Sequence, residues 1–223
     1  MTVVDAGTIK HNLTAVRERI EAVAGDVDRI TIVGVTKTLS ADVVRNAVDA
    51  GIRSVGENYA QELIEKARDI EGDAEAGRRR ARWHFIGQLQ SNKVKSLAAF
   101  VDVWHTVDSI KLVEEIAKRQ PQARIFIQVN ATDDPARGGC DWDDIDHIAE
   151  VASERELVVQ GLMGVGPYGE AELSRPFFRR LVEESNARDL ADVSCGMSGD
   201  FEIAVQEGAT VLRLGSVLFG PRS

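Results

Sequence analysis

Eight short apolar segments, separated by segments with helical periodicity, constrain the fold of this chain more than any other feature. Several are nearly continuous runs of apolar residues, which is typical of parallel strands covered on both faces. Strands that alternate with helices over most of the 223 residues predict an α/β protein, a (β/α)8 TIM-type barrel near the lower size limit of that fold. An open doubly wound sheet is the alternative, but it gives no reason for the first and last strands to meet. The predicted strands are residues 30–36, 52–56, 82–86, 101–106, 124–130, 157–164, 192–196 and 210–215.

Between the strands, apolar residues recur three and four positions apart, as they do on one face of a helix. The first such segment, residues 5–24, predicts an extra N-terminal helix before the first strand. Ser40 and Gly51 fit the N-cap and the C′ position of the next helix, and Ser198 and Gly208 fit the start and end of a short late one. The remaining helices are predicted around residues 59–67, 110–117, 145–152 and 177–182.

Size and composition favour a single domain over residues 1–223. A hydrophobic content of 43% is sufficient for one sizeable core. The net charge of −9 argues against non-specific binding to nucleic acid or to an anionic membrane. The one basic cluster, Arg78-Arg79-Arg80 with Arg82, is explained most simply as a solvated helix–strand junction. Because no long exposed apolar seam indicates obligate assembly, we expect a monomer.

Cysteine usage and the absence of targeting signals indicate the compartment. Cys140 and Cys195 have neither the spacing of metal ligands nor that of a disulfide framework. No apolar run is long enough to span a bilayer, and Met1 is followed by an amphipathic segment instead of a signal peptide. We therefore expect a reduced, cytoplasmic protein without a metal site.

Polar and glycine-rich positions gather where the predicted strands end, and in barrels of this type the active groups sit at those C-terminal ends. Lys37 follows the first strand and would lie beside the last strand once the barrel closes. A lysine at a strand end is most often simply solvated. In a barrel mouth, however, partial desolvation would lower the pKa of its amine and free it to form a Schiff base. The other such positions are Glu57-Asn58, His84, Gly87, Met163-Gly164, Ser198-Gly199, Arg213, Gly215 and Ser216.

Two glycine-rich turns, at Gly196–Asp200 and Arg213–Ser216, follow the last two strands. Phosphate prefers free backbone N–H groups, and glycine lets the backbone approach closely. Barrels often bind phosphate with the loops after their last two strands. The alternative is that Ser198 only caps its helix and Gly215 only turns the chain. A lysine amine beside a phosphate cradle is what a pyridoxal phosphate (PLP) site needs.

Arg213 is predicted to point into the barrel. Strand alternation places Leu212 and Leu214 together on the opposite face, against the helices. Inside the barrel a guanidinium needs an acceptor. One possibility is a carboxylate such as Glu57; the other is the pyridine nitrogen of a cofactor. An arginine at that nitrogen would disfavour its protonation and weaken the ring as an electron sink, which argues against transamination-type chemistry.

Asn58 and His84 each have two interpretations. Asn58 either hydrogen-bonds the ring hydroxyl of a cofactor or caps the following helix. His84 either lines the floor of the pocket or is a satisfied core histidine. His147 and the acidic stretch Asp141–Asp146 are explained as a helix start with a solvated face, because they lack metal-ligand spacing.

At this point the residues match a known family. The chain resembles the pyridoxal phosphate homeostasis proteins, small single-domain relatives of the alanine racemase barrel, over nearly its whole length. The motifs that carry the resemblance are Val35-Thr36-Lys37, Gly56-Glu57-Asn58-Tyr59, Trp83-His84-Phe85-Ile86-Gly87-Gln88-Leu89-Gln90-Ser91-Asn92-Lys93, Val129-Asn130, Gly161-Leu162-Met163, Gly196-Met197-Ser198-Gly199-Asp200, Arg213-Leu214-Gly215-Ser216 and Phe219-Gly220.

The resemblance implies PLP held as a covalent aldimine on Lys37, with Arg213 at the pyridine nitrogen. It also implies a set of further cofactor-binding residues: Asn58, His84, Met163, and, at the phosphate, Ser198, Gly199, Gly215 and Ser216. Three features depart from the family pattern. Thr36 stands where serine is common, Arg137 stands where lysine is usual, and residues 164–169 are unusually rich in glycine.

Two functions compete. In the first, the protein is a PLP-binding carrier in intracellular vitamin B6 homeostasis that delivers the cofactor, with apo PLP-dependent enzymes as recipients, by transaldimination and without turnover. In the second, it is a PLP-dependent racemase of the alanine racemase type, which needs a second acid–base group. In those enzymes a tyrosine from an additional domain supplies that group; here only Tyr59 and Tyr168 are available, and we expect the carrier. A Schiff-base aldolase is a third alternative, but no proton-relay acid or second lysine near Lys37 is evident.

Overall fold

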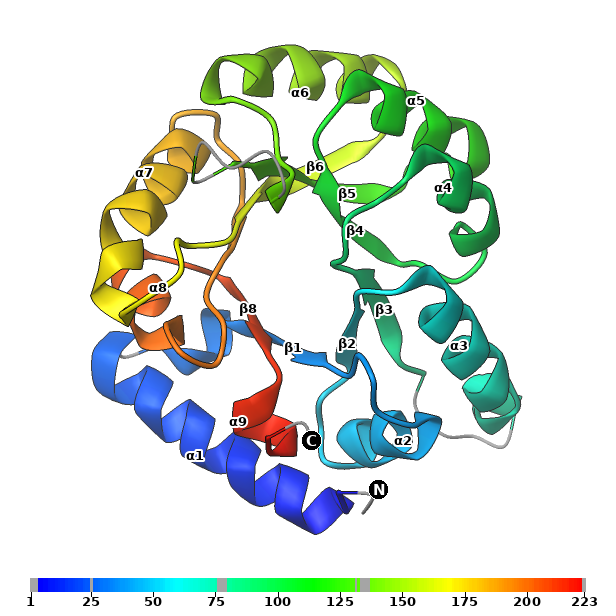
Figure 1. The fold of residues 1–223 in the computed structure, drawn as a ribbon, viewed down its shortest axis with the longest axis vertical. Helices are drawn as coiled ribbons and strands as arrows, with labels where there is room; N and C mark the ends of the chain where they lie inside the picture. Colours follow the sequence, from blue (N-terminus) through cyan, green and yellow to red (C-terminus); the bar gives the residue numbers. More distant parts are fainter. Residues whose placement is uncertain (1–3, 25, 76–79, 131, 133–136, 222–223) are drawn as a thin grey trace.

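A computed structural model shows a closed barrel of eight parallel strands, with β8 hydrogen-bonded to β1 (Figure 1). The predicted barrel is therefore confirmed, and the eight predicted apolar segments coincide with its strands. These are β1 Thr31–Val35, β2 Ser54–Glu57, β3 Arg82–Phe85, β4 Val103–Val107, β5 Arg124–Val129, β6 Val158–Gly164, β7 Asp192–Ser194 and β8 Val211–Leu214. The structure describes residues 4–24, 26–75, 80–130, 132 and 137–221. Half of the basic cluster, residues 78 and 79, lies outside the described residues.

Helices form a ring around the barrel (Figure 1). The predicted N-terminal helix α1 is present and packs against α2, α8 and α9. The helices are α1 Ala6–Ala24, α2 Ala41–Asp49, α3 Ala60–Glu75, α4 Ser91–Leu97, α5 Ile110–Arg119, α6 Ile145–Glu154, α7 Arg175–Asn186, α8 Phe201–Glu207 and α9 Ser216–Phe219, with short 3₁₀ segments at Val27–Arg29, Trp142–Asp144 and Ala171–Ser174. No helix in the described parts of the chain is long and apolar enough to cross a membrane.

The apolar core has two parts, one on each side of the sheet. The larger part fills the space between the strands and the helices and includes Leu212 and Leu214. The smaller part fills the barrel interior and consists of Val33, Val103, Phe126, Met163 and Val211. Because side chains alternate along a strand, Arg213 lies on the interior side together with Val211. The predicted orientation of this arginine is confirmed.

The start of α8 differs from its prediction. The helix begins at Phe201 with Asp200 at the N-cap position, so Ser198 lies outside it. Gly208, with a φ of +108°, ends the helix as predicted. Asp200 accepts a hydrogen bond from Met197 N at 2.7 Å, which orders the turn ahead of the helix. Ser198 is thereby left to contact a different loop.

Two helices were not predicted from the sequence. The α4 helix buries only Val94 and Leu97, too few apolar positions to define a helical period. The α9 helix has four residues and follows β8 directly. In contrast, α2 ends as predicted: Gly51, with a φ of +101°, follows its C-terminal turn. Ser40 occupies the predicted N-cap position, although its side chain makes no capping hydrogen bond.

Candidate functional site

Lys37 lies two residues after the end of β1, where its side chain is half-buried. Strand β1 pairs with β8 so that Val33 stands opposite Arg213. The C-terminal ends of parallel strands point the same way, so Lys37 shares one end of the barrel with the turn that follows β8. We call this end the mouth. The first and last strands therefore bring together residues that are about 180 positions apart in the sequence.

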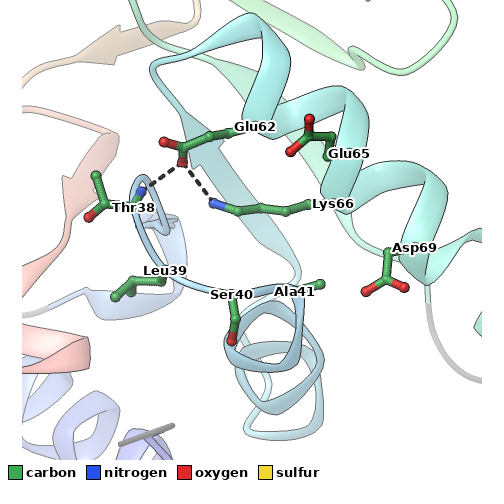
Figure 2. A pocket seen from close by; sticks show the side chains of 8 residues that line it. All are labelled: Thr38, Leu39, Ser40, Ala41, Glu62, Glu65, Lys66 and Asp69. Atoms are coloured by element: carbon green, nitrogen blue, oxygen red, sulfur yellow. Dashed lines mark hydrogen bonds and ion pairs between the residues drawn. The ribbon is translucent and has the colours of Figure 1, made fainter. Parts of the chain in front are cut away.

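The loop that carries Lys37 is held from outside the barrel by helix α3. Lys66 of α3 donates hydrogen bonds to Thr36 O at 2.9 Å, to Glu57 Oε1 at 2.8 Å and to Glu62 Oε2 at 3.1 Å. Glu62 also accepts from Thr38 N at 2.7 Å, as Figure 2 shows. Both neighbours of Lys37 are thus tied to α3. We call Thr36, Glu57, Glu62 and Lys66 the Lys66 bracket.

Glu57 belongs to this bracket and faces the helices. Its carboxylate is fully buried and accepts from Thr36 Oγ1 at 2.6 Å as well as from Lys66. Burial raises the pKa of Glu57, while the Lys66 ammonium and the hydrogen bonds from Lys66 and Thr36 oppose that rise. The sequence alternative in which Glu57 pairs with Arg213 is therefore wrong. A pocket of about 390 Å³ lies behind the bracket, between the 38–41 loop and α3 (Figure 2).

The turns after β7 and β8 meet at Ser198. Its Oγ accepts hydrogen bonds from the backbone N–H groups of Gly215 at 3.2 Å and Val217 at 3.3 Å. Gly196 has a φ of +87°, and a Cβ there would approach Ala204 Cβ to 2.7 Å, so this turn requires glycine. Gly199 is exposed, and a Cβ built on it would contact nothing within 4 Å. Backbone donors that follow β8 thus bind the serine hydroxyl of the turn after β7, which joins the two glycine-rich turns.

Arg213 is almost fully buried in the barrel interior. Its guanidinium donates to Ser194 O at 2.7 Å, to Ser194 Oγ at 2.8 Å and to Gly164 O at 2.9 Å. All three acceptors are neutral oxygens, so the positive charge is not balanced by these contacts. Desolvation lowers the pKa of Arg213 from its ordinary value.

A chain of buried side chains continues from Arg213 across the barrel. Ser194 Oγ lies 3.0 Å from His105 Nδ1, and His105 Nε2 lies 2.8 Å from His84 Nδ1. The His105 ring also stacks on Phe126, with ring centroids 4.5 Å apart. Burial, and to a smaller extent the Arg82 charge, lowers the pKa of His84 to about 3. Burial, His84 and Arg213 hold the pKa of His105 well below its ordinary value, so both rings are neutral.

Among the described residues, three buried side-chain atoms have no hydrogen-bond partner: Glu57 Oε2 on the helix side of the sheet, and Asn58 Oδ1 and His84 Nε2 toward the mouth. Asn58 Oδ1 therefore does not cap the following helix. His84 has a hydrogen-bond partner at Nδ1 but none at Nε2. Strand β2 pairs with β3 so that Gly56 stands opposite His84, which places Asn58 two residues beyond that level. Buried polar groups without partners are rare, and each one calls for an explanation such as a bound group that completes it.

The remaining predicted residues lie around this centre. Met163 is buried in the interior core directly before Gly164, whose carbonyl binds Arg213. Ser216 is exposed at the start of α9. Arg137 contacts the glycine-rich loop of residues 164–169: it donates to Gly166 O at 2.6 Å, and its guanidinium lies 3.9 Å from the centroid of the Tyr168 ring. Arg137 thus holds this loop through one hydrogen bond and one cation–π contact.

Sequence reasoning missed His105, Ser194 and Lys66. A usable signal for His105 was present, because Trp83-His84 and Trp104-His105 repeat the same pair on two successive predicted strands. Alternation sends both tryptophans outward and both histidines inward, where adjacent strands bring them together. Lys66 and Ser194 carried no such signal.

Comparisons with known proteins place the chain among its relatives. The model of the family "Alanine racemase, N-terminal domain" matches residues 4–223. A protein of Escherichia coli K12 named pyridoxal phosphate homeostasis protein is 34% identical over 230 residues, covering 96% of this chain and 97% of its own. A protein of the same name from Aquifex aeolicus is 37% identical over 228 residues, covering 94% and 96%. The chain belongs to the pyridoxal phosphate homeostasis protein family.

Membership of the pyridoxal phosphate homeostasis protein family confirms the resemblance drawn from the motifs. Among solved structures, PipY of Synechococcus elongatus with PLP bound is 29% identical to this chain, with a TM-score of 0.82. The alignment covers 95% of this chain and 100% of PipY. The family likeness thus extends over the whole barrel, including every element that forms the mouth.

Proposed function

We propose that this chain binds PLP at the mouth of its barrel, with Lys37 as the covalent anchor, and serves intracellular PLP homeostasis as a carrier. The observation that carries the proposal is the pair of buried, unpartnered atoms Asn58 Oδ1 and His84 Nε2 at the same barrel end as Lys37. A polar ligand with a planar ring supplies partners for both. The PLP bound in PipY, a relative of 29% identity, supports this choice of ligand.

The residues at the mouth fit the three parts of this cofactor. When bound, PLP supplies an aldehyde that condenses with a primary amine, and Lys37 provides that amine. The turns after β7 and β8 meet where Ser198 Oγ accepts from Gly215 N and Val217 N, and we assign the phosphate to this place, with Ser198, Gly199, Gly215 and Ser216 around it.

Arg213 is assigned to the pyridine nitrogen of the cofactor. A guanidinium offers only N–H donors and no acceptor, so its partner must be an unprotonated nitrogen. Met163, buried next to Gly164, forms the apolar floor. An unprotonated ring withdraws electrons weakly, which suits holding the cofactor better than carbanion chemistry.

The positions of the two tyrosines favour a carrier over a racemase. Racemisation needs acid–base groups on both faces of the reacting carbon. Tyr59 is 55% exposed, and Tyr168 is 89% exposed with its ring against Arg137. Neither side chain is directed into the barrel interior as a second acid–base group. The proposal includes a monomeric carrier that passes PLP to apo PLP-dependent enzymes.

The test combines absorption spectroscopy with chemical trapping. The purified protein is mixed with PLP, its visible spectrum is recorded, and borohydride is added before peptide mass analysis. We expect a visible band that borohydride removes, with the cofactor mass on the Lys37 peptide. Lys37→Ala removes both signals, whereas Lys10→Ala, an exposed lysine on α1, keeps them. Label spread over surface lysines contradicts the assigned anchor.

The carrier and racemase alternatives separate in a second assay on the loaded protein. Incubation with L-alanine and with a panel of other L-amino acids is followed by measurement of the D-enantiomers. We expect no product above the level given by free PLP. Sustained formation of a D-amino acid that requires Lys37 would establish the racemase alternative.

A further inference from the structure

Arg213, Ser194, His105 and His84 form a row of hydrogen bonds inside the barrel, and Arg213 determines which atom donates in each of them. Arg213 can only donate, so Ser194 Oγ accepts from it at 2.8 Å. The single hydroxyl proton of Ser194 is then directed to His105 Nδ1, 3.0 Å away. A neutral imidazole has one donor and one acceptor nitrogen, so His105 carries its proton on Nε2. That proton points at His84 Nδ1, 2.8 Å away.

The same rule applied to the last ring fixes its tautomer. His84 Nδ1 accepts from His105, so the proton of the neutral His84 ring sits on Nε2. This is the nitrogen that lacks a partner. If His105 instead carried its proton on Nδ1, Ser194 Oγ would accept from both Arg213 and His105. The hydroxyl proton of Ser194 would then have no acceptor among Arg213, His105 and His84. These four side chains are only 0% to 4% exposed, and a buried hydroxyl or N–H group without a partner is costly in free energy. The arrangement in which every proton between Arg213 and His84 has an acceptor is therefore strongly preferred.

We propose that His105 is a positioning residue which, with Ser194, transmits the donor direction of Arg213 to His84, so that His84 Nε2–H selects a hydrogen-bond acceptor on the ligand at the mouth. The inference rests on the proposed function for the identity of that ligand, PLP, but the tautomer is a property of the protein alone. His105 itself touches no ligand in this proposal. Its ring is enclosed by Phe126, Ser194 and His84.

The first test reads the tautomers in the protein without PLP. Nitrogen NMR of 15N-histidine-labelled protein distinguishes protonated from unprotonated ring nitrogens. The chain has four histidines, and His11→Gln and His147→Gln assign the signals of the two exposed ones. We expect both buried rings in a single Nε2–H form. A His84 ring protonated on Nδ1 would overturn the proposal, whatever PLP does.

The second test breaks the chain at its smallest member. Ser194→Ala removes the hydroxyl that orders His105 while Arg213 keeps the Ser194 backbone acceptor. We expect the single His84 form to become a mixture of tautomers. The matched control is Ser185→Ala, another fully buried serine, whose hydroxyl donates to Asp192 O and has no contact with the chain. If His84 keeps a single tautomer in Ser194→Ala, the Ser194 hydroxyl does not determine which nitrogen of His84 carries the proton.

The third test adds PLP to these variants and to His105→Phe, which keeps an aromatic ring against Phe126. The dissociation constant of PLP should rise about fivefold in Ser194→Ala, the effect of one neutral hydrogen bond, and remain unchanged in Ser185→Ala. An ordered Nε2–H form in the apo protein together with no PLP binding would contradict the proposed function and leave the tautomer assignment standing. Equal affinities of the wild type and Ser194→Ala would overturn the ligand part of the inference.

Discussion

His84 and His105 are held neutral because they are enclosed by the barrel. Most histidines gain a proton when the pH falls below about 6.5. Burial and, to a smaller extent, the nearby Arg82 charge together lower the pKa of His84 to about 3. At the His84 site the folded protein therefore binds fewer protons than the unfolded chain at pH values between about 3 and 6.5. Because the unfolded chain binds the additional proton, the His84 contribution to the free energy of unfolding decreases as the pH falls through that range.

This linkage gives a prediction for a single residue. The His84 contribution lowers the free energy of unfolding by about 1.4 kcal/mol for each pH unit well below 6.5. Urea unfolding at pH 7, 6, 5 and 4.5 measures the slope. His84→Phe should have a slope shallower by that amount, while the exposed His11→Gln should match the wild type. Parallel curves for His84→Phe and wild type would mean that His84 is not held neutral.

Helix α3 is coupled to strands β1 and β2 through a buried ion pair. The side chains of Lys66 and Glu57 are 8% and 0% exposed, and their charged atoms lie 2.8 Å apart. A buried pair is weak evidence for net stability, but removal of one partner leaves an uncompensated charge. Because Lys66 also binds Thr36 O, loss of its ammonium would remove one of the two hydrogen bonds from α3 to the loop that carries Lys37, and the bond from Thr38 N to Glu62 would remain.

At this scale the prediction is a double-mutant cycle. Lys66→Met should lower the free energy of unfolding by about 3–5 kcal/mol, because Glu57 stays buried without its cation. Glu57→Leu combined with Lys66→Met should cost clearly less than Lys66→Met alone. Arg119→Met serves as the control, since its pair with Glu115 is partly exposed and worth about 1 kcal/mol or less. Additive effects of the two bracket substitutions would contradict the coupling.

The elements themselves were largely predictable from the sequence, for physical reasons. Parallel strands buried on both faces are apolar throughout, so all eight were visible as short runs. The α4 helix was not, since it is short and buries only Val94 and Leu97. The start of α8 was placed too early because Ser198 has the chemistry of a cap, whereas Asp200 takes the N-cap position.

The candidate site was predictable where a residue's local sequence determines its position in the barrel. Lys37, Arg213 and the two glycine turns follow from strand alternation and loop position. The partners of these residues come from elements far apart in the chain: Lys66 lies 30 residues from Thr36, and Ser194 lies 89 residues from His105. No local pattern encodes such pairs, so the Lys66 bracket and the histidine chain emerge only in the folded barrel.

At the scale of the whole molecule, the site lies where the barrel closes. Lys37 follows β1, Ser198 follows β7 and Gly215 follows β8, and β1 pairs with β8 over residues Thr31–Gly34 and Val211–Leu214. A ligand held by all three turns connects the first strand to the last two. Opening of the barrel at this seam would require the ligand to leave. Binding should therefore stabilise the fold and protect both ends of the chain together.

The last prediction measures both effects. At a PLP concentration 100 times its dissociation constant, the free energy of unfolding should rise by about 2.7 kcal/mol. For a domain of this size that is a Tm increase of about 5–11 °C. Hydrogen exchange should slow in β1 and β8 together, and less in β4 and β5 on the far side of the barrel. Lys37→Ala should lose most of the increase, because only the phosphate turns and Arg213 still hold the ligand. A ligand anchored to the turns after β1, β7 and β8 must be released before β1 and β8 separate. Protection confined to β4 and β5, or an unchanged Tm, would therefore show that PLP does not connect β1 to β8.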